Sequence, residues 1–131
     1  MPVHVVSVKS GRHEEMIDIT AEVMSFVRSS GVSDGICYVF TPHTTAAITI
    51  NENADPDVQS DFIKGLKFLK LENVDFSHSE GNSAAHIKSS IVGCSEFVIV
   101  EGGRLKLGTW QGIYFCEFDG PRARQVYVTV K

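Results

Sequence analysis

The chain has 131 residues, 43% of them hydrophobic, with a formal net charge of −4 and a pI near 5.7. This length predicts a single domain with one hydrophobic core. An acidic chain without a clustered basic face does not match a nucleic-acid-binding surface. No apolar run approaches the ~18 residues of a membrane span, so we expect no contact with the membrane interior.

The cysteines and the N-terminus both predict a reducing compartment. Cys37, Cys94 and Cys116 are odd in number and form no CxxC pair, which favours free thiols. The N-terminus lacks the charged-then-apolar pattern of a secretion signal. We therefore predict a cytoplasmic protein whose cysteines are buried and inert.

The first half of the chain alternates strands with helices. Residues 3–9 and 14–19 predict two strands joined by the turn Ser10-Gly11-Arg12. The β-branched and aromatic residues at 35–40 and 45–50 predict two more. Thr20 predicts the cap of a helix over 21–28, which Gly31 ends. Asp55 and Pro56 predict the cap and first residue of the longest helix.

The second half begins with a shorter helix and ends in strands. Ser83 predicts the cap of a helix over 84–92, with Ile87 and Ile91 facing inward. Four further strands are predicted, over residues 97–100, 105–107, 111–118 and 122–130. Gly102 and Gly103 indicate a hairpin between the first two of these strands. Together the elements predict one α+β domain over residues 1–131.

Three histidines in polar segments are the main candidates for a functional site. His43 follows a proline at a strand boundary, His78 lies in a polar loop, and His86 lies near the start of a helix, where the dipole keeps an imidazole neutral. Neutral imidazoles that leave one position open predict a catalytic divalent metal, with zinc favoured. The alternative is a set of hydrogen-bonded histidines, because their spacing matches no standard zinc motif.

Candidate residues for acid–base chemistry and for phosphate contact lie nearby in the sequence. Glu52 ends an apolar strand, where it would act as a base or orient a ligand histidine, or else be a solvated strand end. The start of the 84–92 helix offers free N–H groups, and Lys88, Ser89 and Ser90 add donors. For these three residues the alternative is a solvated helix face.

The segment Gly108-Thr109-Trp110-Gln111-Gly112 carries an indole and an amide between two glycines. This pattern favours a tight bend that presents Trp110 and Gln111 to a cavity, with Gln111 as a further phosphate contact. The alternative is a strand turn that buries Trp110 in the core.

Five segments together resemble a known family. They are His43-Thr44-Thr45-Ala46, Asn51-Glu52-Asn53-Ala54-Asp55-Pro56, Glu80-Gly81-Asn82, His86-Ile87-Lys88-Ser89-Ser90 and Gly108-Thr109-Trp110-Gln111-Gly112-Ile113. They are similar, in matching order over essentially the whole chain, to the YjbQ-like family, also named the secondary thiamine-phosphate synthase family.

This resemblance implies a sandwich-like α+β fold, mainly of antiparallel sheets with two or three helices, that usually forms a homotrimer. It also implies a metal held on His43, His78 and His86, and a weak thiamine-phosphate synthase activity. That reaction joins an aminopyrimidine diphosphate to a thiazole phosphate and releases pyrophosphate. The apolar strands at 97–100 and 113–118 agree with a trimer.

The expected partner is a small phosphorylated metabolite, with Glu52 and the three histidines as catalytic residues. Two alternatives stay open. One is a non-catalytic trimeric module that binds an anion or a metal, and the other is a metal-dependent hydrolase of a phosphorylated metabolite.

Overall fold

The computed structural model describes residues 2–131, which form two antiparallel β-sheets and three α-helices. The larger sheet has five strands in the order β1 (His4–Lys9), β8 (Ala123–Val130), β3 (Gly35–Phe40), β5 (Ser95–Glu101) and β6 (Arg104–Leu105). The smaller sheet has three, in the order β2 (Glu15–Asp18), β7 (Gln111–Glu117) and β4 (Ala46–Glu52). The predicted α+β class with mainly antiparallel sheets is confirmed.

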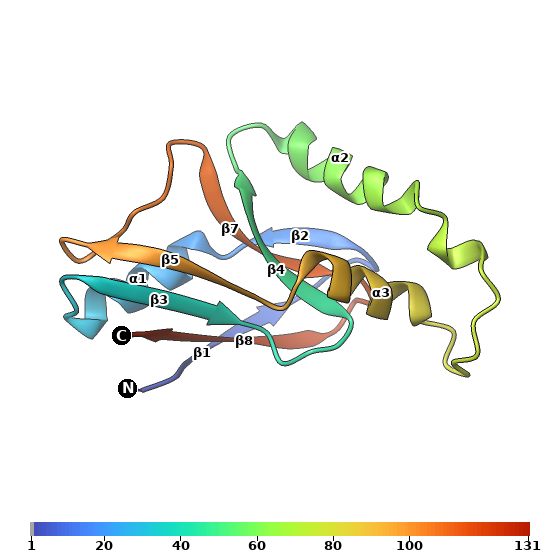
Figure 1. The fold of residues 1–131 in the computed structure, drawn as a ribbon, viewed down its shortest axis with the longest axis horizontal. Coiled ribbons are helices and arrows are strands. Elements are labelled where there is room, and N and C mark those ends of the chain that lie inside the picture. The colour runs from blue at the N-terminus through green and yellow to red at the C-terminus, as the bar shows by residue number, and fades with distance from the viewer. Residues whose placement is uncertain (1) are drawn as a thin grey trace.

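The helices are α1 (Thr20–Ser30), α2 (Pro56–Lys67) and α3 (Ser83–Val92), with a short 3-10 turn η1 (Leu71–Asn73) between the last two. Figure 1 shows α2 and α3 on the side of the smaller sheet, and the long connection between them at one end of the molecule. Within residues 2–131 no helix combines the length and the apolar character that crossing a membrane requires.

The main core lies between the two sheets. Alternate residues of β8 and β3, including Val126, Val128 and Val39, face residues of the smaller sheet such as Ile48 and Phe115. This period of two is what a strand with one buried face requires. α1 closes this core through Val23 and Val27, which are 0% and 1% exposed.

A second core covers the other face of the smaller sheet. Ala47, Tyr114 and Cys116 pack there with Ala85 of α3, and half-buried residues of α2 such as Phe62 complete the cluster. β7 is therefore buried on both faces. This explains the apolar run at 113–118, which the sequence analysis had also connected with a trimer.

Two helix starts and one helix face differ from the predictions. Thr20 is the first residue of α1 instead of its cap, because its hydroxyl donates to Asp18 at 2.5 Å and accepts from the backbone N–H of Ile113 at 2.8 Å. Ser83 likewise begins α3, after Asn82. The predicted inward position of Ile91 is wrong, since this side chain is 58% exposed. The cap at Asp55 is confirmed by its bond to the N–H of Asp57.

The outer face of the five-stranded sheet carries exposed apolar side chains. Tyr38 pairs with Phe97, and Phe40 pairs with Tyr127 in the registers of neighbouring strands, so all four point to one side. Phe97 is 61% exposed and Tyr38 is 43% exposed. The helices pack into the two cores, which leaves this face uncovered in the chain.

Candidate active site

His43 lies half-buried in the turn between β3 and β4. Its Nε2 accepts the backbone N–H of Gln125 at 2.9 Å. Burial and the charge of Arg124 hold the pKa of His43 below its ordinary value of 6.5, so the ring is neutral at pH 7. In a neutral ring whose Nε2 accepts, the proton is on Nδ1. His43 therefore offers a hydrogen-bond donor on its free side.

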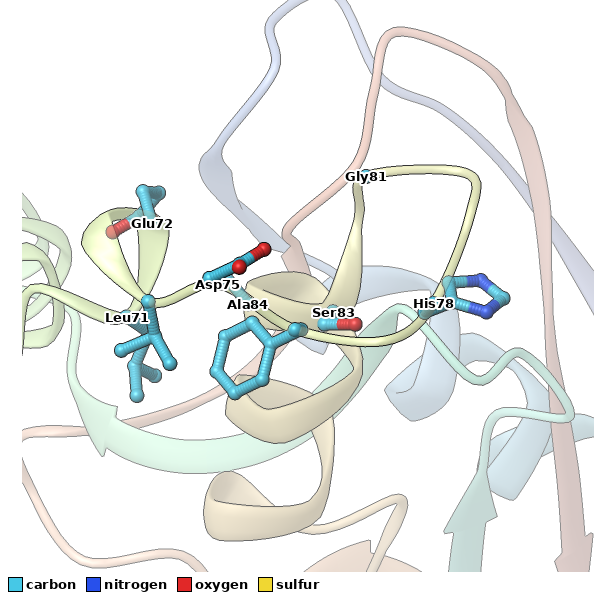
Figure 2. Close-up of a pocket in the computed structure, with 9 residues that line it drawn as sticks. Leu71, Glu72, Asp75, His78, Gly81, Ser83 and Ala84 are labelled. Carbon is cyan, nitrogen blue, oxygen red and sulfur yellow. The ribbon is translucent and has the colours of Figure 1, made fainter.

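His78 and His86 are brought together from the loop and from α3. Their ring centroids are 5.4 Å apart at an interplanar angle of 85°, an edge-to-face contact. Figure 2 shows His78 on the loop that leads through Gly81 into Ser83, at the start of α3. His86 is half-buried, whereas His78 is exposed.

A cavity of about 470 Å³ connects His43 with His86. The predicted phosphate contacts Ser89 and Ser90 line the same cavity, together with the exposed Cys94. Cavities of ~300–1,000 Å³ are typical of small-ligand sites. Two predicted histidines and two predicted serines thus share one site of suitable size.

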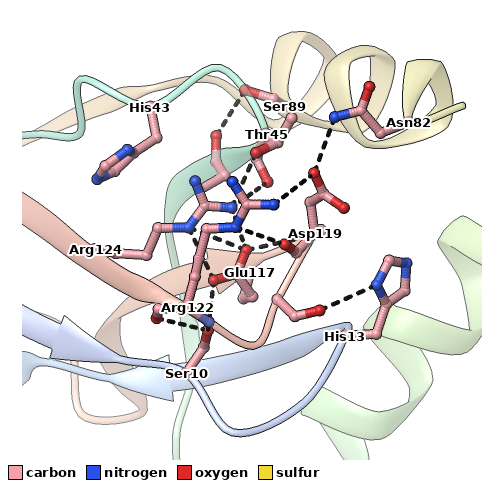
Figure 3. A network of polar contacts seen from close by, with 12 residues as sticks. Ser10, His13, His43, Thr45, Asn82, Ser89, Glu117, Asp119, Arg122 and Arg124 are labelled. Carbon is pink, nitrogen blue, oxygen red and sulfur yellow. Dashed lines mark hydrogen bonds and ion pairs between the residues drawn. The ribbon is translucent and has the colours of Figure 1, made fainter. Parts of the chain in front are cut away.

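Arg124 and Glu117 form a buried ion pair beside His43 (Figure 3). The Arg124 side chain is 3% exposed and also donates to the Thr45 hydroxyl at 2.9 Å. Burial alone would raise the pKa of Glu117, but hydrogen bonds from Arg124 and Ser10 outweigh it and hold the pKa below its ordinary value of 4.5. Glu117 is thus ionised at neutral pH and fixes a guanidinium at the edge of the site.

The start of α3 is tied to the turn after β7. Asn82 donates to Asp119 at 2.9 Å, and the Arg122 side chain contacts the same carboxylate at 3.2 Å. Figure 3 shows Asn82 at the start of α3 and the side chain of Asp119 between Asn82 and Arg122. The Oδ1 of Asn82 is buried and has no hydrogen-bond partner among the described residues. These contacts hold the first turn of α3, which carries His86.

The three histidines do not form a metal site within one chain. Among residues 2–131, no group of three or more His, Cys, Asp or Glu side chains is arranged to hold a metal ion. The lone pair of His43 Nε2 is also engaged with Gln125, and Nδ1 carries the proton. In this arrangement the three imidazoles therefore do not fit a zinc ion.

Lys88 has different partners from those expected. Its side chain is 2% exposed, and its Nζ lies 2.7 Å from Glu14 and 2.5 Å from Glu72. Lys88 therefore does not lie on a solvated helix face. Its ammonium is engaged by the two carboxylates and is not free to bind a phosphate. The inward face of α3 consists of Ala85, Lys88 and Ser89.

Glu52, Trp110 and Gln111 lie away from the histidines. Glu52 ends β4, which begins three residues after His43, and a strand of 7 residues spans roughly 20 Å. Gln111 pairs with Glu52 in the sheet register, and its side chain accepts the N–H of Gly108 at 2.8 Å. Trp110 is 62% exposed, which rules out the alternative that buries it in the core.

The cysteines separate into two kinds. Cys37 and Cys116 are buried as predicted, and burial raises the pKa of their thiols to about 11 and about 12. Cys94 is exposed at the edge of the histidine cavity, which contradicts its predicted burial.

Arg124 is the main site residue that was not predicted from the sequence. The sequence did contain a signal that Arg124 is buried. Arg124 has the same parity as Val126, Val128 and Val130 along β8, so it points inward with them. A charged residue at an inward position requires a buried partner.

The fold and the cavity define an α+β sandwich protein with a histidine-lined pocket beside a buried arginine. The family model described as UPF0047 protein YjbQ-like matches residues 4–131. The chain belongs to this YjbQ-like UPF0047 family, which confirms the resemblance found in the sequence.

Relatives from bacteria and archaea match over nearly their whole length. UPF0047 protein YugU of Bacillus subtilis is 55% identical over 124 residues, 94% of each chain. A UPF0047 protein of Methanocaldococcus jannaschii is 54% identical over 94% of this chain and 89% of its own. The crystal structure of an uncharacterized YjbQ/UPF0047 family protein from Clostridium acetobutylicum is 55% identical, covers 98% of this chain and 99% of its own, and superposes with a TM-score of 0.95.

Proposed function

We propose that the chain is an enzyme that acts on small phosphorylated metabolites, with a reaction of the thiamine-phosphate synthase type. The observation that carries the proposal is the cavity shared by His43, His86, Ser89 and Ser90 beside the buried Arg124. Imidazole and hydroxyl donors around one cavity, with a guanidinium close by, suit a phosphate or diphosphate group. The family resemblance supplies the reaction.

The proposed reaction breaks the bond between the methylene carbon of the aminopyrimidine and its diphosphate oxygen. The electron pair leaves with pyrophosphate, and the thiazole nitrogen then forms a bond to the same carbon. No oxidant or reductant is needed. Because negative charge develops on the leaving oxygen, donors fixed beforehand around the diphosphate accelerate the step.

The residues that line the cavity have different roles in this step. His43 donates from Nδ1, since its Nε2 accepts from Gln125. Ser90 is exposed at the cavity wall, whereas the hydroxyl of Ser89 donates to the carbonyl of Ala46 at 2.6 Å and fixes α3 against β4. Ser90 therefore serves as a contact to the ligand, and Ser89 as a structural support.

A turnover assay with an aminopyrimidine diphosphate and a thiazole phosphate tests the proposal by the release of pyrophosphate. We expect His43→Ala and His86→Ala to lower kcat/KM about 10²–10³-fold, the usual effect of removing a donor to a developing anion. His4→Ala is the matched control, because His4 stacks on Phe26 at a centroid distance of 4.9 Å, away from the cavity. Tight binding of both substrates without turnover would contradict the enzyme and favour the binding module.

Zinc binding stays a prediction, and no step of the proposed reaction depends on it. The ligands predicted from the sequence, His43, His78 and His86, would need a different side-chain arrangement or further donors. Elemental analysis of protein purified without chelators tests the prediction. About one ion per chain would support it.

We further propose that the chain assembles as a homotrimer through the outer face of the five-stranded sheet. This face presents Phe97, Tyr38 and Phe40 side by side, with Tyr127 at a centroid distance of 6.3 Å from Phe40. Contiguous exposed apolar side chains favour an interface with another chain. The resemblance to a family that is usually trimeric favours a second copy of the chain as the partner.

A further inference from the structure

We propose that Lys88, Glu14 and Glu72 form an ionic latch that positions His78 against His86, which makes Lys88 a positioning residue of the candidate site. This inference rests on the proposed function only in counting His78 and His86 as part of the site. The latch itself follows from the contacts of a buried lysine that no step of the reaction uses.

Lys88 joins three segments that are distant in the sequence. It extends from α3 to Glu14, just before β2, and to Glu72 in η1, with Nζ–Oε distances of 2.7 Å and 2.5 Å. Burial alone would lower the pKa of Lys88, but the hydrogen bonds that its ammonium donates to both carboxylates outweigh burial and raise the pKa above 10.5. An ammonium buried to this degree is tolerated only when it is paired, so losing a partner is costly.

The segment between α2 and α3 has few other restraints. Its apolar side chains are largely exposed, namely Phe68 at 80%, Leu69 at 52% and Val74 at 52%. Half-buried Leu71 and Phe76 line a pocket in this segment, and Figure 2 shows Leu71 at one end of it. With little apolar area removed from water, packing contributes little to the position of this segment.

The latch restrains the segment at one end, and the bond from Asn82 to Asp119 restrains it at the other. His78 lies between these two points. Its ring is exposed and makes an aromatic contact with His86, which is two residues before Lys88 on the same helix. Releasing Glu72 therefore frees the loop that carries His78, while the buried face of α3 stays in place.

Glu72 is the position at which to test the latch, because its side chain is 49% exposed and its removal leaves no buried cavity. Glu72→Ala removes the ion pair, whereas Glu72→Gln keeps an acceptor without the charge. Glu101→Ala is the matched control, since it breaks the exposed ion pair with Lys106 on the other side of the fold.

The measurement uses NMR of the full chain without substrate. In Glu72→Ala we expect the amides of Asn73 and Val74, which are hydrogen-bonded within η1, to exchange about fivefold faster. We also expect weaker cross-relaxation between the ring protons of His78 and His86, with Glu72→Gln intermediate and Glu101→Ala unchanged.

Faster exchange with unchanged His78–His86 cross-relaxation would overturn the proposal, because the latch would then hold η1 alone. No change in either quantity would also overturn it. Lys88→Met should reproduce the Glu72→Ala result, and if it does not fold, the Glu72 variants decide. A failed turnover assay would count against the proposed function and would not alter this outcome.

Discussion

Gly112 lies where the backbone of β7 passes close to Asn53. A Cβ on Gly112 would meet the side chain of Asn53 at 2.5 Å from its Nδ2 and 2.8 Å from its Cβ. The backbone N–H of Asn53 is held at 2.9 Å from the carbonyl of Trp110. The contact therefore cannot be relieved by rotating one side chain, and this close approach is a structural reason for the glycine in the Trp110-Gln111-Gly112 segment.

We predict that Gly112→Ala lowers the free energy of unfolding by about 1–3 kcal/mol, as expected for overpacking. Gly65→Ala in α2 is the control. A Cβ there meets nothing within 4 Å, and alanine is the better helix former, so stability should rise by about 0.5–1 kcal/mol. Urea unfolding of both variants at one protein concentration measures the two changes. A neutral Gly112→Ala would contradict the close packing.

The three thiols should differ in reactivity. Cys94 is exposed, whereas burial raises the pKa of Cys37 to about 11 and that of Cys116 to about 12. Because the thiolate is the reactive form, we predict that native protein at pH 8 reacts quickly with one equivalent of a thiol reagent. Cys94→Ser should abolish this fast phase, and three equivalents should react after denaturation. A fast phase that survives in Cys94→Ser would contradict the assignment.

At the scale of single residues, the sequence predicted His43 and His86 because they lie in polar segments, and Ser89 and Ser90 because they add donors close to His86. It could not predict which hydrogen bond His43 makes. The partner, Gln125, is 82 positions away, and only the pairing of β3 with β8 brings the two together.

Among the elements, β7 and β8 are connected by the buried pair of Glu117 and Arg124, although they belong to different sheets. The pKa of Glu117 is held below 4.5, so its unfolded form binds a proton more readily than its folded form. Its contribution to stability is therefore complete above pH 4.5 and is lost as the pH falls through the folded value. His43, with a pKa below 6.5, shifts stability in the same direction.

We predict that Glu117→Gln lowers the free energy of unfolding by about 3–5 kcal/mol at pH 7, because Arg124 keeps its charge in a buried position without a counter-ion. The variant should also lose less stability than the wild type between pH 6 and pH 3. Unfolding curves across this range measure both effects. Glu101→Gln, at a carboxylate that is 64% exposed, should change stability by less than about 1 kcal/mol. A wild-type pH dependence in Glu117→Gln would contradict the assignment.

Helix faces were the least predictable feature of the elements. The spacing of Ile87 and Ile91 indicated one inward face of α3, but the buried positions are Ala85, Lys88 and Ser89. Apolar periodicity fails here because Lys88 is buried by pairing with two carboxylates from other segments, and one sequence does not reveal such pairing. Strand alternation was more reliable because every strand has a face in one of the cores.

At the scale of the whole molecule, the histidine site borders the uncovered face of the larger sheet. Ser7, Lys9 and Gln125 line a second cavity, which shares only His43 with the cavity that contains His86. Ser7 pairs with Gln125, two positions along from the pair of Val5 and Tyr127, so these side chains share the outer face. A trimer formed through this face would therefore cover the second cavity and the side of His43 that lines it.

We predict that Phe97→Glu breaks this assembly, because Phe97 is 61% exposed on the apolar face and a carboxylate there would have to be desolvated. Light scattering at micromolar concentration should give three times the chain mass of 14.4 kDa for the wild type and a single chain mass for Phe97→Glu. Phe68→Glu is the control, since Phe68 is 80% exposed beyond the end of α2, away from the sheet. A wild-type monomer would refute the trimer, whereas a trimer that survives Phe97→Glu would place its interface on another face. If the trimer covers the cavity, Phe97→Glu should also lose turnover while Phe68→Glu retains it, which would connect the assembly to the site.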